Sequence, residues 1–150
     1  MVITFCGHSK IYKDNNLEDD IFQLLIDEKL EGKVDFYLGG YGHFDMIAEK
    51  SCMRYKNINS FANIHFITPY LNDQYLKNKM DMSGFDDSIY PEIEQVPKKF
   101  AIVERNKWMV KQSDLVIAYV NYSWGGAVNT LEYAHKLKKR YINLGAYSFS

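Results

Sequence analysis

The chain alternates between short apolar runs and longer amphipathic stretches. The apolar runs have the length and composition of buried β-strands, and several of them end at a glycine or a proline. Five such strands are predicted, at Val2–Cys6, Val34–Leu38, Ile64–Thr68, Asp114–Val120 and Tyr141–Leu144. Between most of them the apolar positions repeat with the period of a helix. Helices are predicted over Leu17–Leu30, Phe44–Tyr55 and Lys98–Gln112, and after Gly126.

Residues 70–97 lack a sustained period and are predicted to form a long functional or mobile loop. Elsewhere, strands alternate with helices, and this predicts a parallel sheet with helices on both faces. We expect a single α/β domain over residues 1–150, with a five-stranded parallel sheet in the order 3-2-1-4-5. Such sheets bind ligands at the carboxyl ends of their strands, at the switch between strands 1 and 4.

Composition narrows the class of protein. The chain has 150 residues, of which 47% are hydrophobic, and this length suits one compact core. Its 18 basic and 19 acidic residues give a net charge of −1, which disfavours binding to nucleic acid. No apolar stretch approaches the roughly 20 residues of a membrane span. The start of the chain lacks the features of a secretory signal, so a cytoplasmic location is expected.

The sequence gives no sign of a metal or cofactor. Cys6 and Cys52 both fall within apolar patterns and are predicted to be buried thiols. His43, His65 and His135 do not have the spacing of metal ligands.

Three glycine-bearing turns follow predicted strands. Glycine lets backbone N–H groups approach an anion closely, and the N-terminus of a following helix adds a positive partial charge. One such turn often serves geometry alone, but three at the same edge favour a nucleotide or phosphosugar site. Neither the dinucleotide fingerprint nor the Walker motif is present. The turns are Gly7-His8-Ser9, Gly39-Gly40-Tyr41-Gly42 and Gly125-Gly126.

Four polar residues are candidates for chemistry near these turns, and each has a structural alternative. Arg105 could bind a phosphate or a carboxylate, or lie on a solvated helix face. Glu132 could face the cleft or point outward. His8 could donate to a phosphate or make a structural hydrogen bond. For Asp45 we favour capping of the helix that follows the second turn over catalysis.

Four segments resemble motifs of one superfamily. Phe5–Ser9 resembles F-C-G-S-S, and Tyr37–Gly42 with Met46 resembles Y-G-G-G…G-L-M-G. Glu104–Met109 is similar to E-R-K-x-x-M, and Trp124–Glu132 to P-G-G-x-G-T-x-x-E. The matches run in order over nearly the whole chain. The sequence therefore resembles the SLOG superfamily of nucleotide-binding proteins, and within it the YpsA-like branch. The superfamily also contains the lonely-guy (LOG) phosphoribohydrolases.

The resemblance implies a Rossmann-like three-layer sandwich, a homodimer and a nucleotide site. By resemblance to LOG enzymes, Arg105 and Glu132 would serve hydrolysis of the N-glycosidic bond of a nucleoside 5′-monophosphate, releasing base and ribose 5-phosphate. The expected ligand-binding residues are those of the three glycine turns together with Trp124, Asn129 and Thr130.

Departures from the motif separate two hypotheses. Trp124, Val128 and Asn129 stand where the LOG motif has proline, glycine and threonine. The first hypothesis is therefore a domain that binds a nucleotide or a nucleotide-derived ligand. The alternative is a LOG-type N-glycosidase, a hydrolase. Tyr41, Tyr122 and Trp124 could stack on a base. DNA binding, a third class found within the superfamily, is disfavoured by the net charge.

Overall fold

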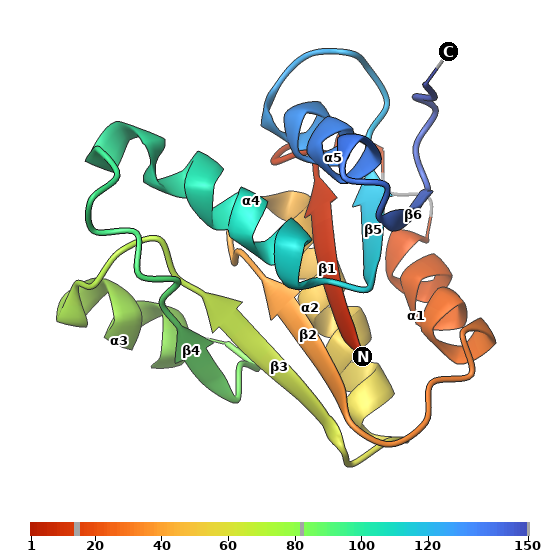
Figure 1. Ribbon diagram of the computed structural model, residues 1–150. Coiled ribbons are helices and arrows are strands. Elements are labelled where there is room, and N and C mark those ends of the chain that lie inside the picture. Colours follow the sequence, from red (N-terminus) through yellow and green to blue (C-terminus); the bar gives the residue numbers. More distant parts are fainter. Residues whose placement is uncertain (14–15, 82, 150) are drawn as a thin grey trace.

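The computed structural model describes residues 1–13, 16–81 and 83–149. Within these residues, six parallel strands form one sheet with helices on both faces, a Rossmann-like three-layer arrangement (Figure 1). The elements are β1 (Val2–Gly7), α1 (Leu17–Asp27), β2 (Val34–Leu38), α2 (His43–Lys56), β3 (Ala62–Ile67), α3 (Asp73–Asp81), β4 (Asp87–Ile89), the 3-10 turn η1 (Lys98–Phe100), α4 (Ala101–Gln112), β5 (Leu115–Tyr119), α5 (Gly126–Lys136) and β6 (Arg140–Asn143).

The strand order is β4-β3-β2-β1-β5-β6. The five strands predicted from the apolar runs take the predicted order, but the predicted number of five is wrong because β4 adds an edge strand. β4 has three residues, two of them exposed, so it leaves no apolar run in the sequence. The segment predicted as a long loop thus contains both β4 and α3, which has no buried residues.

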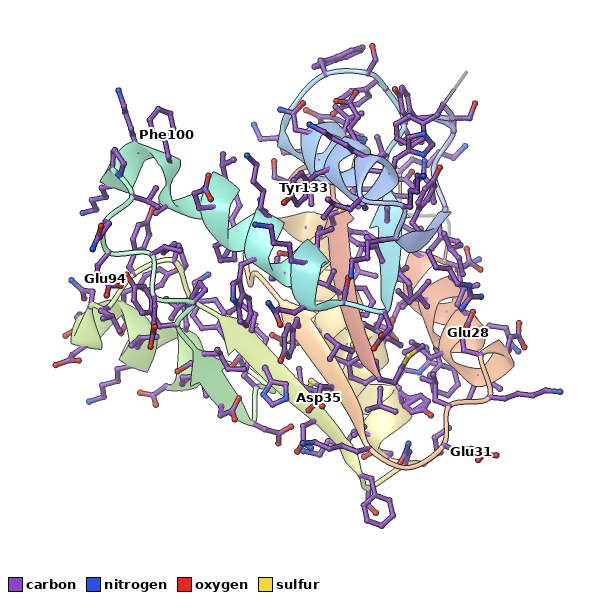
Figure 2. All side chains as sticks on the ribbon, in the orientation of Figure 1. Glu28, Glu31, Asp35, Glu94, Phe100 and Tyr133 are labelled. Carbon is purple, nitrogen blue, oxygen red and sulfur yellow. The ribbon has the colours of Figure 1, made fainter. Side chains whose placement is uncertain are left out.

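Two hydrophobic cores lie on opposite faces of the sheet. Ile3 and Phe5 of β1 pack in the core covered by α1 and α2, whereas Cys6 packs in the core with residues of α4 and α5. This alternation follows from the two-residue period of a strand. α4 and α5 lie side by side on their face, and Figure 2 labels Tyr133 of α5 where the two helices meet. The Lys107 ammonium is 5.5 Å from the ring centroid of Tyr133. Both cysteines are buried free thiols, as predicted.

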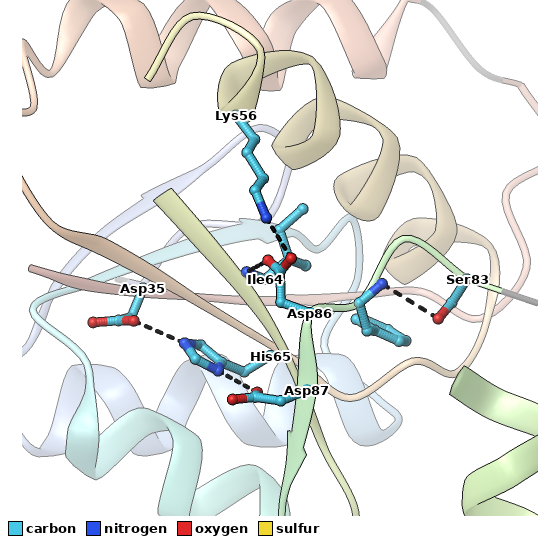
Figure 3. Close-up of polar contacts among 8 residues, drawn as sticks. Asp35, Lys56, Ile64, His65, Ser83, Asp86 and Asp87 are labelled. Atoms are coloured by element: carbon cyan, nitrogen blue, oxygen red, sulfur yellow. Dashed lines mark hydrogen bonds and ion pairs between the residues drawn. The ribbon is translucent and has the colours of Figure 1, made fainter. Parts of the chain in front are cut away.

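Side-chain contacts attach the short strand β4 to its neighbour (Figure 3). Asp86 accepts a hydrogen bond of 2.8 Å from the Ile64 N–H and forms an ion pair with Lys56. His65 lies between two carboxylates, with Nε2 2.7 Å from Asp35 and Nδ1 2.5 Å from Asp87. These contacts supplement the few backbone hydrogen bonds that three residues can form.

Because every strand pair is parallel, the carboxyl ends of the strands meet at one edge of the sheet. The loops that follow β1, β2 and β5 meet there, together with the first turns of α2 and α5. Across the described ranges, no helix combines the length and the apolar character that crossing a bilayer requires.

Candidate functional site

A cavity of about 340 Å³ opens at this carboxyl edge. Its volume falls within the range of small-molecule sites, roughly 300–1,000 Å³. Residues from β1, α2, α4, the loop after β5 and α5 line it: Phe5, Cys6, Gly7, His8, Ser9, Tyr41, Asp45, Ile102, Arg105, Asn106, Met109, Tyr122, Trp124, Gly125, Gly126, Ala127 and Thr130.

Arg105 brings a buried positive charge to the wall of this cavity. The residue is only 3% exposed, so the alternative of a solvated helix face is wrong. Its Nη1 donates to the carbonyls of Gly39 (3.0 Å) and Ile67 (2.8 Å), and its Nε donates to Asn106 Oδ1 (2.9 Å). Burial lowers the pKa of Arg105, and nearby Asp45 opposes that shift. An arginine nevertheless stays charged in proteins. Its Nη2 has no hydrogen-bond partner in the part of the chain that the structure describes.

The glycine turn after β2 shapes the cavity without lining it, except at Tyr41. A Cβ on Gly39 would lie 3.0 Å from Cζ and from Nη2 of Arg105, so glycine lets the guanidinium pack against the backbone. Gly42 packs on Ser9, and a Cβ there would lie 2.7 Å from the Ser9 Cα. The Gly40 carbonyl accepts a 2.5 Å hydrogen bond from Lys79. Gly39, Gly40 and Gly42 are thus absent from the lining of this cavity, and Gly40 and Gly42 line a second cavity beside α2.

The first turn of α2 is already occupied by protein groups. The His43 N–H donates to the Ser9 carbonyl (2.9 Å), and the Phe44 N–H donates to the His8 carbonyl (3.3 Å). The Tyr41 N–H donates to the carboxylate of Asp45 (3.2 Å), so Asp45 bonds the residue before the N-cap Gly42 rather than capping the helix, and no side chain caps α2 among the described residues. These N–H groups are consequently not free to bind an anion.

The first turn of α5 is open by contrast. Gly125 has a φ of +100° and precedes the helix, and no side chain caps it among the described residues. A Cβ on Gly125 or Gly126 would meet no atom within 4 Å. Thr130 lines the cavity, and its hydroxyl donates to the Gly126 carbonyl (3.0 Å). The uncapped N–H groups and the positive end of the helix dipole are thus available at the cavity.

Three stacked rings form another wall. Tyr122 lies between His8 and Trp124, with centroid distances of 4.1 Å to each. His8 Nε2 accepts a 2.9 Å hydrogen bond from the Asn121 N–H, so its ring proton is on Nδ1. Burial lowers the pKa of His8, which also favours the neutral ring. Of the two roles considered for His8, the structure contains the structural hydrogen bond. Trp124 is 67% exposed and presents a flat surface.

Glu132 and Asn129 lie outside the cavity. Both are exposed and neither lines it. Glu132 follows Thr130 by two residues, which turns it by about 200° around the helix. The structure therefore does not bring Glu132 and Arg105 together at the cavity. The carboxylate that does line the cavity is Asp45, and burial raises its pKa to about 6.

Known structures share this fold at low sequence identity. TM1055, a Northeast Structural Genomics Consortium target, has a TM-score of 0.57 and 12% identity over 93% of this chain and 71% of its own. DNA processing protein A (DprA) from Streptococcus pneumoniae has a TM-score of 0.64 and 12% identity over 94% of this chain and 49% of its own. DprA from Helicobacter pylori, which binds single-stranded DNA, has a TM-score of 0.62 and 15% identity over 95% and 64%.

The chain thus spans less than two thirds of either DprA protein, and the likeness establishes the fold. No protein-family model matches the chain, and no curated protein matches it by sequence.

Proposed function

We propose that this chain is a SLOG-type domain that binds a nucleotide or nucleotide-derived ligand by its anionic group. The observation that carries the proposal is that the buried Arg105 and the uncapped start of α5 line the same cavity. The likeness to TM1055 and DprA supports the superfamily at the level of the fold. Assignment to the YpsA-like branch rests on the sequence motifs.

Arg105 and α5 together suit a phosphate. A guanidinium makes charge-assisted hydrogen bonds to phosphate oxygens, and a helix N-terminus adds N–H donors and a favourable dipole. No carboxylate lies within ion-pair distance of Arg105 among the residues described, so its charge is available to a ligand. Both groups act in a partly buried site, where electrostatic attraction exceeds that in water.

Titration calorimetry with AMP, GMP, ribose 5-phosphate and adenosine tests the proposal. We expect saturable binding of the phosphorylated compounds and weaker binding of adenosine. Gly126→Asp should lower the affinity for the phosphorylated compounds by about tenfold or more, because it adds a negative charge where the phosphate binds. The space around Gly126 accepts a side chain, and an acidic residue suits the start of a helix.

Asn129→Asp is the matched control. It adds the same charge to the same helix at an exposed position outside the cavity. We expect it to change the affinity by less than about threefold. Absence of saturable binding, or an equal loss in both variants, would contradict the proposal.

Hydrolysis of the N-glycosidic bond is the alternative function, and the carboxyl group of Asp45 in the cavity favours it. Incubation of the protein with nucleoside monophosphates measures release of free base. If the chain is such an enzyme, Asp45→Asn should abolish release, because a nearby carboxylate stabilises the oxocarbenium character of the sugar. Loss of release in Glu132→Ala with retention in Asp45→Asn would instead support the role that the LOG motif gives to Glu132.

Single-stranded DNA is a competing ligand, because DprA from H. pylori shares this fold and binds it. The net charge of −1 disfavours such binding for this chain. We expect negligible affinity for a single-stranded oligonucleotide at physiological salt. Strong binding that weakens steeply as the salt concentration rises would indicate that the ligand is a single-stranded nucleic acid and not a small molecule.

A further inference from the structure

A second cavity, of about 550 Å³, adjoins the first, and Asp45 lines both. It lies between α2, which contributes Met46 and Glu49, and α3, which contributes Tyr75 and Lys79. Asp45 is therefore part of the wall of both cavities.

Two carboxyl groups face the second cavity from one side of α2. Asp45 and Glu49 are four residues apart, which places them on the same helix face. Asp45 accepts a hydrogen bond from the Tyr41 N–H through Oδ2, and its Oδ1 has no hydrogen-bond partner among the described residues. Glu49 is half-buried and lines the same cavity. Ionised carboxylates only accept hydrogen bonds, so this wall suits a ligand that supplies donors.

Aromatic rings form the facing part of the second cavity. Phe85 stacks on Phe66 with a centroid distance of 5.2 Å, and Tyr75 lies 6.0 Å from the same Phe66 ring. Tyr75 and Phe85 line the cavity. Lys79, which also lines it, has its ammonium 5.9 Å from the Tyr75 ring. The cavity therefore combines acceptors on one side with flat apolar surface on another, as a nucleoside requires.

We propose that the second cavity is the nucleoside subsite and that the ligand is a guanine ribonucleotide. Its phosphate lies in the first cavity, the 2′-hydroxyl of its ribose donates to Asp45, and its base lies beside Tyr75 and Phe85. Glu49 accepts from the base. Guanine is the base of choice because its N1–H and 2-amino groups offer two adjacent donors to one carboxylate, whereas adenine offers only its amino group there. The inference rests on the proposed function, which supplies the phosphate anchor.

Three nucleotides and two isosteric variants test each contact separately. The nucleotides are GMP, 2′-deoxy-GMP and IMP, which lacks the 2-amino group. For the parent protein, we expect GMP to bind about tenfold more tightly than either analogue, because 2′-deoxy-GMP removes the donor to Asp45 and IMP removes one of the two donors to Glu49. Asp45→Asn should reduce the difference between GMP and 2′-deoxy-GMP, because an amide oxygen is a weaker acceptor than a carboxylate, but keep that between GMP and IMP. Glu49→Gln should do the reverse.

Trp124→Ala tests the other place where a base could stack, because Trp124 lines the first cavity. Loss of GMP affinity in Trp124→Ala with no effect of Glu49→Gln would overturn the inference while leaving the proposed function intact. Equal affinity of the parent for GMP, 2′-deoxy-GMP and IMP would do the same. Failure of all nucleotides and of ribose 5-phosphate to bind would overturn both. Thermal unfolding of each variant shows whether a loss of nucleotide affinity arises from misfolding.

Discussion

Gly39 keeps the charge of Arg105 in the cavity wall because it has no side chain. A Cβ at this position would lie 3.0 Å from the guanidinium carbon of Arg105. The Nη1 of the same guanidinium donates to the backbone carbonyls of Gly39 and Ile67, which fix its position. A larger residue in place of Gly39 would overpack a site whose neighbours cannot easily move.

Gly39→Ala should therefore lower the free energy of unfolding by about 1–3 kcal/mol, because the guanidinium must move from its carbonyl partners. Gly126→Ala is the matched control, since a Cβ there meets no atom within 4 Å. We expect that variant to unfold within about 0.5 kcal/mol of the parent in urea. Similar unfolding midpoints for the two variants would show that Gly39 is not needed for packing.

The pKa of Asp45 links stability to pH. Burial is the main cause that raises this pKa from the model-compound value of 3.8 to about 6, although the Tyr41 N–H, Arg105 and Lys79 oppose the shift. The folded protein therefore holds this proton more tightly than the unfolded chain does. The stabilisation from Asp45 is complete below the unfolded value and is lost as the pH rises through the folded value.

Asp45→Asn should consequently gain stability relative to the parent as the pH rises from 4 to 7, by on the order of 1 kcal/mol. Urea unfolding of both proteins across this range measures the difference. A difference that does not change with pH would mean that the carboxyl group of Asp45 titrates normally in the folded protein.

At the scale of elements, the edge strand β4 depends on side chains rather than on its own length. Asp86 holds it to β3 through the Ile64 N–H and to α2 through Lys56. Burial opposes ionisation of Asp86, but the hydrogen bonds from Lys56 and Ile64 outweigh it and lower its pKa.

Asp86→Ala should free this edge without unfolding the central sheet. We expect faster amide hydrogen exchange in β4 and at Ile64, and a loss of about 1–2 kcal/mol, while β1 and β5 stay protected. Asp81→Ala removes an exposed carboxylate from α3 and serves as the control. Unchanged exchange in β4 of the Asp86→Ala protein would contradict this account.

The sequence predicts elements that bury an apolar pattern and misses those that do not. β1, β2, β3, β5 and β6 follow continuous or alternating apolar runs, and their order follows from right-handed crossovers. α3 buries none of its residues, and β4 is too short to show a period. Neither leaves a signal that distinguishes it from a loop.

The sequence predicts only part of the candidate site, because a motif gives the order of residues but not the direction of each side chain. Motif order locates Arg105 and the turn at Gly125-Gly126, both of which line the cavity. It does not give the phase of α5, which turns Glu132 away, nor the contacts that the loop after β1 makes with the start of α2. Asp45 lies next to the buried residue Phe44 in the first turn of α2, which is equally typical of a capping residue.

At the scale of the whole molecule, the homodimer expected from the sequence motifs stays a prediction. Phe100 and Val103 are 48% and 50% exposed, three residues apart at the start of α4, and Figure 2 shows Phe100 pointing away from the rest of the protein. Exposed apolar side chains of this kind are enriched at interfaces between subunits.

Val103→Glu should shift the sedimentation coefficient from that of a dimer to that of a monomer, because a charge would be buried at the contact. Ile58→Glu, at a 63% exposed residue that follows α2, should leave the dimer intact. A parent protein that sediments as a monomer at all concentrations, or a dimer that persists in the Val103→Glu protein, would exclude this contact.

The carbonyls of His8 and Ser9 accept hydrogen bonds from the first turn of α2, so the loop after β1 is ordered without a ligand. Much of the receptor wall is thus preorganised, and association need not bear the entropic cost of ordering that loop. We therefore expect ligand association to be fast and its rate constant to change little when a residue of the pocket is substituted. Variants with different affinities should differ mainly in the rate at which the ligand dissociates.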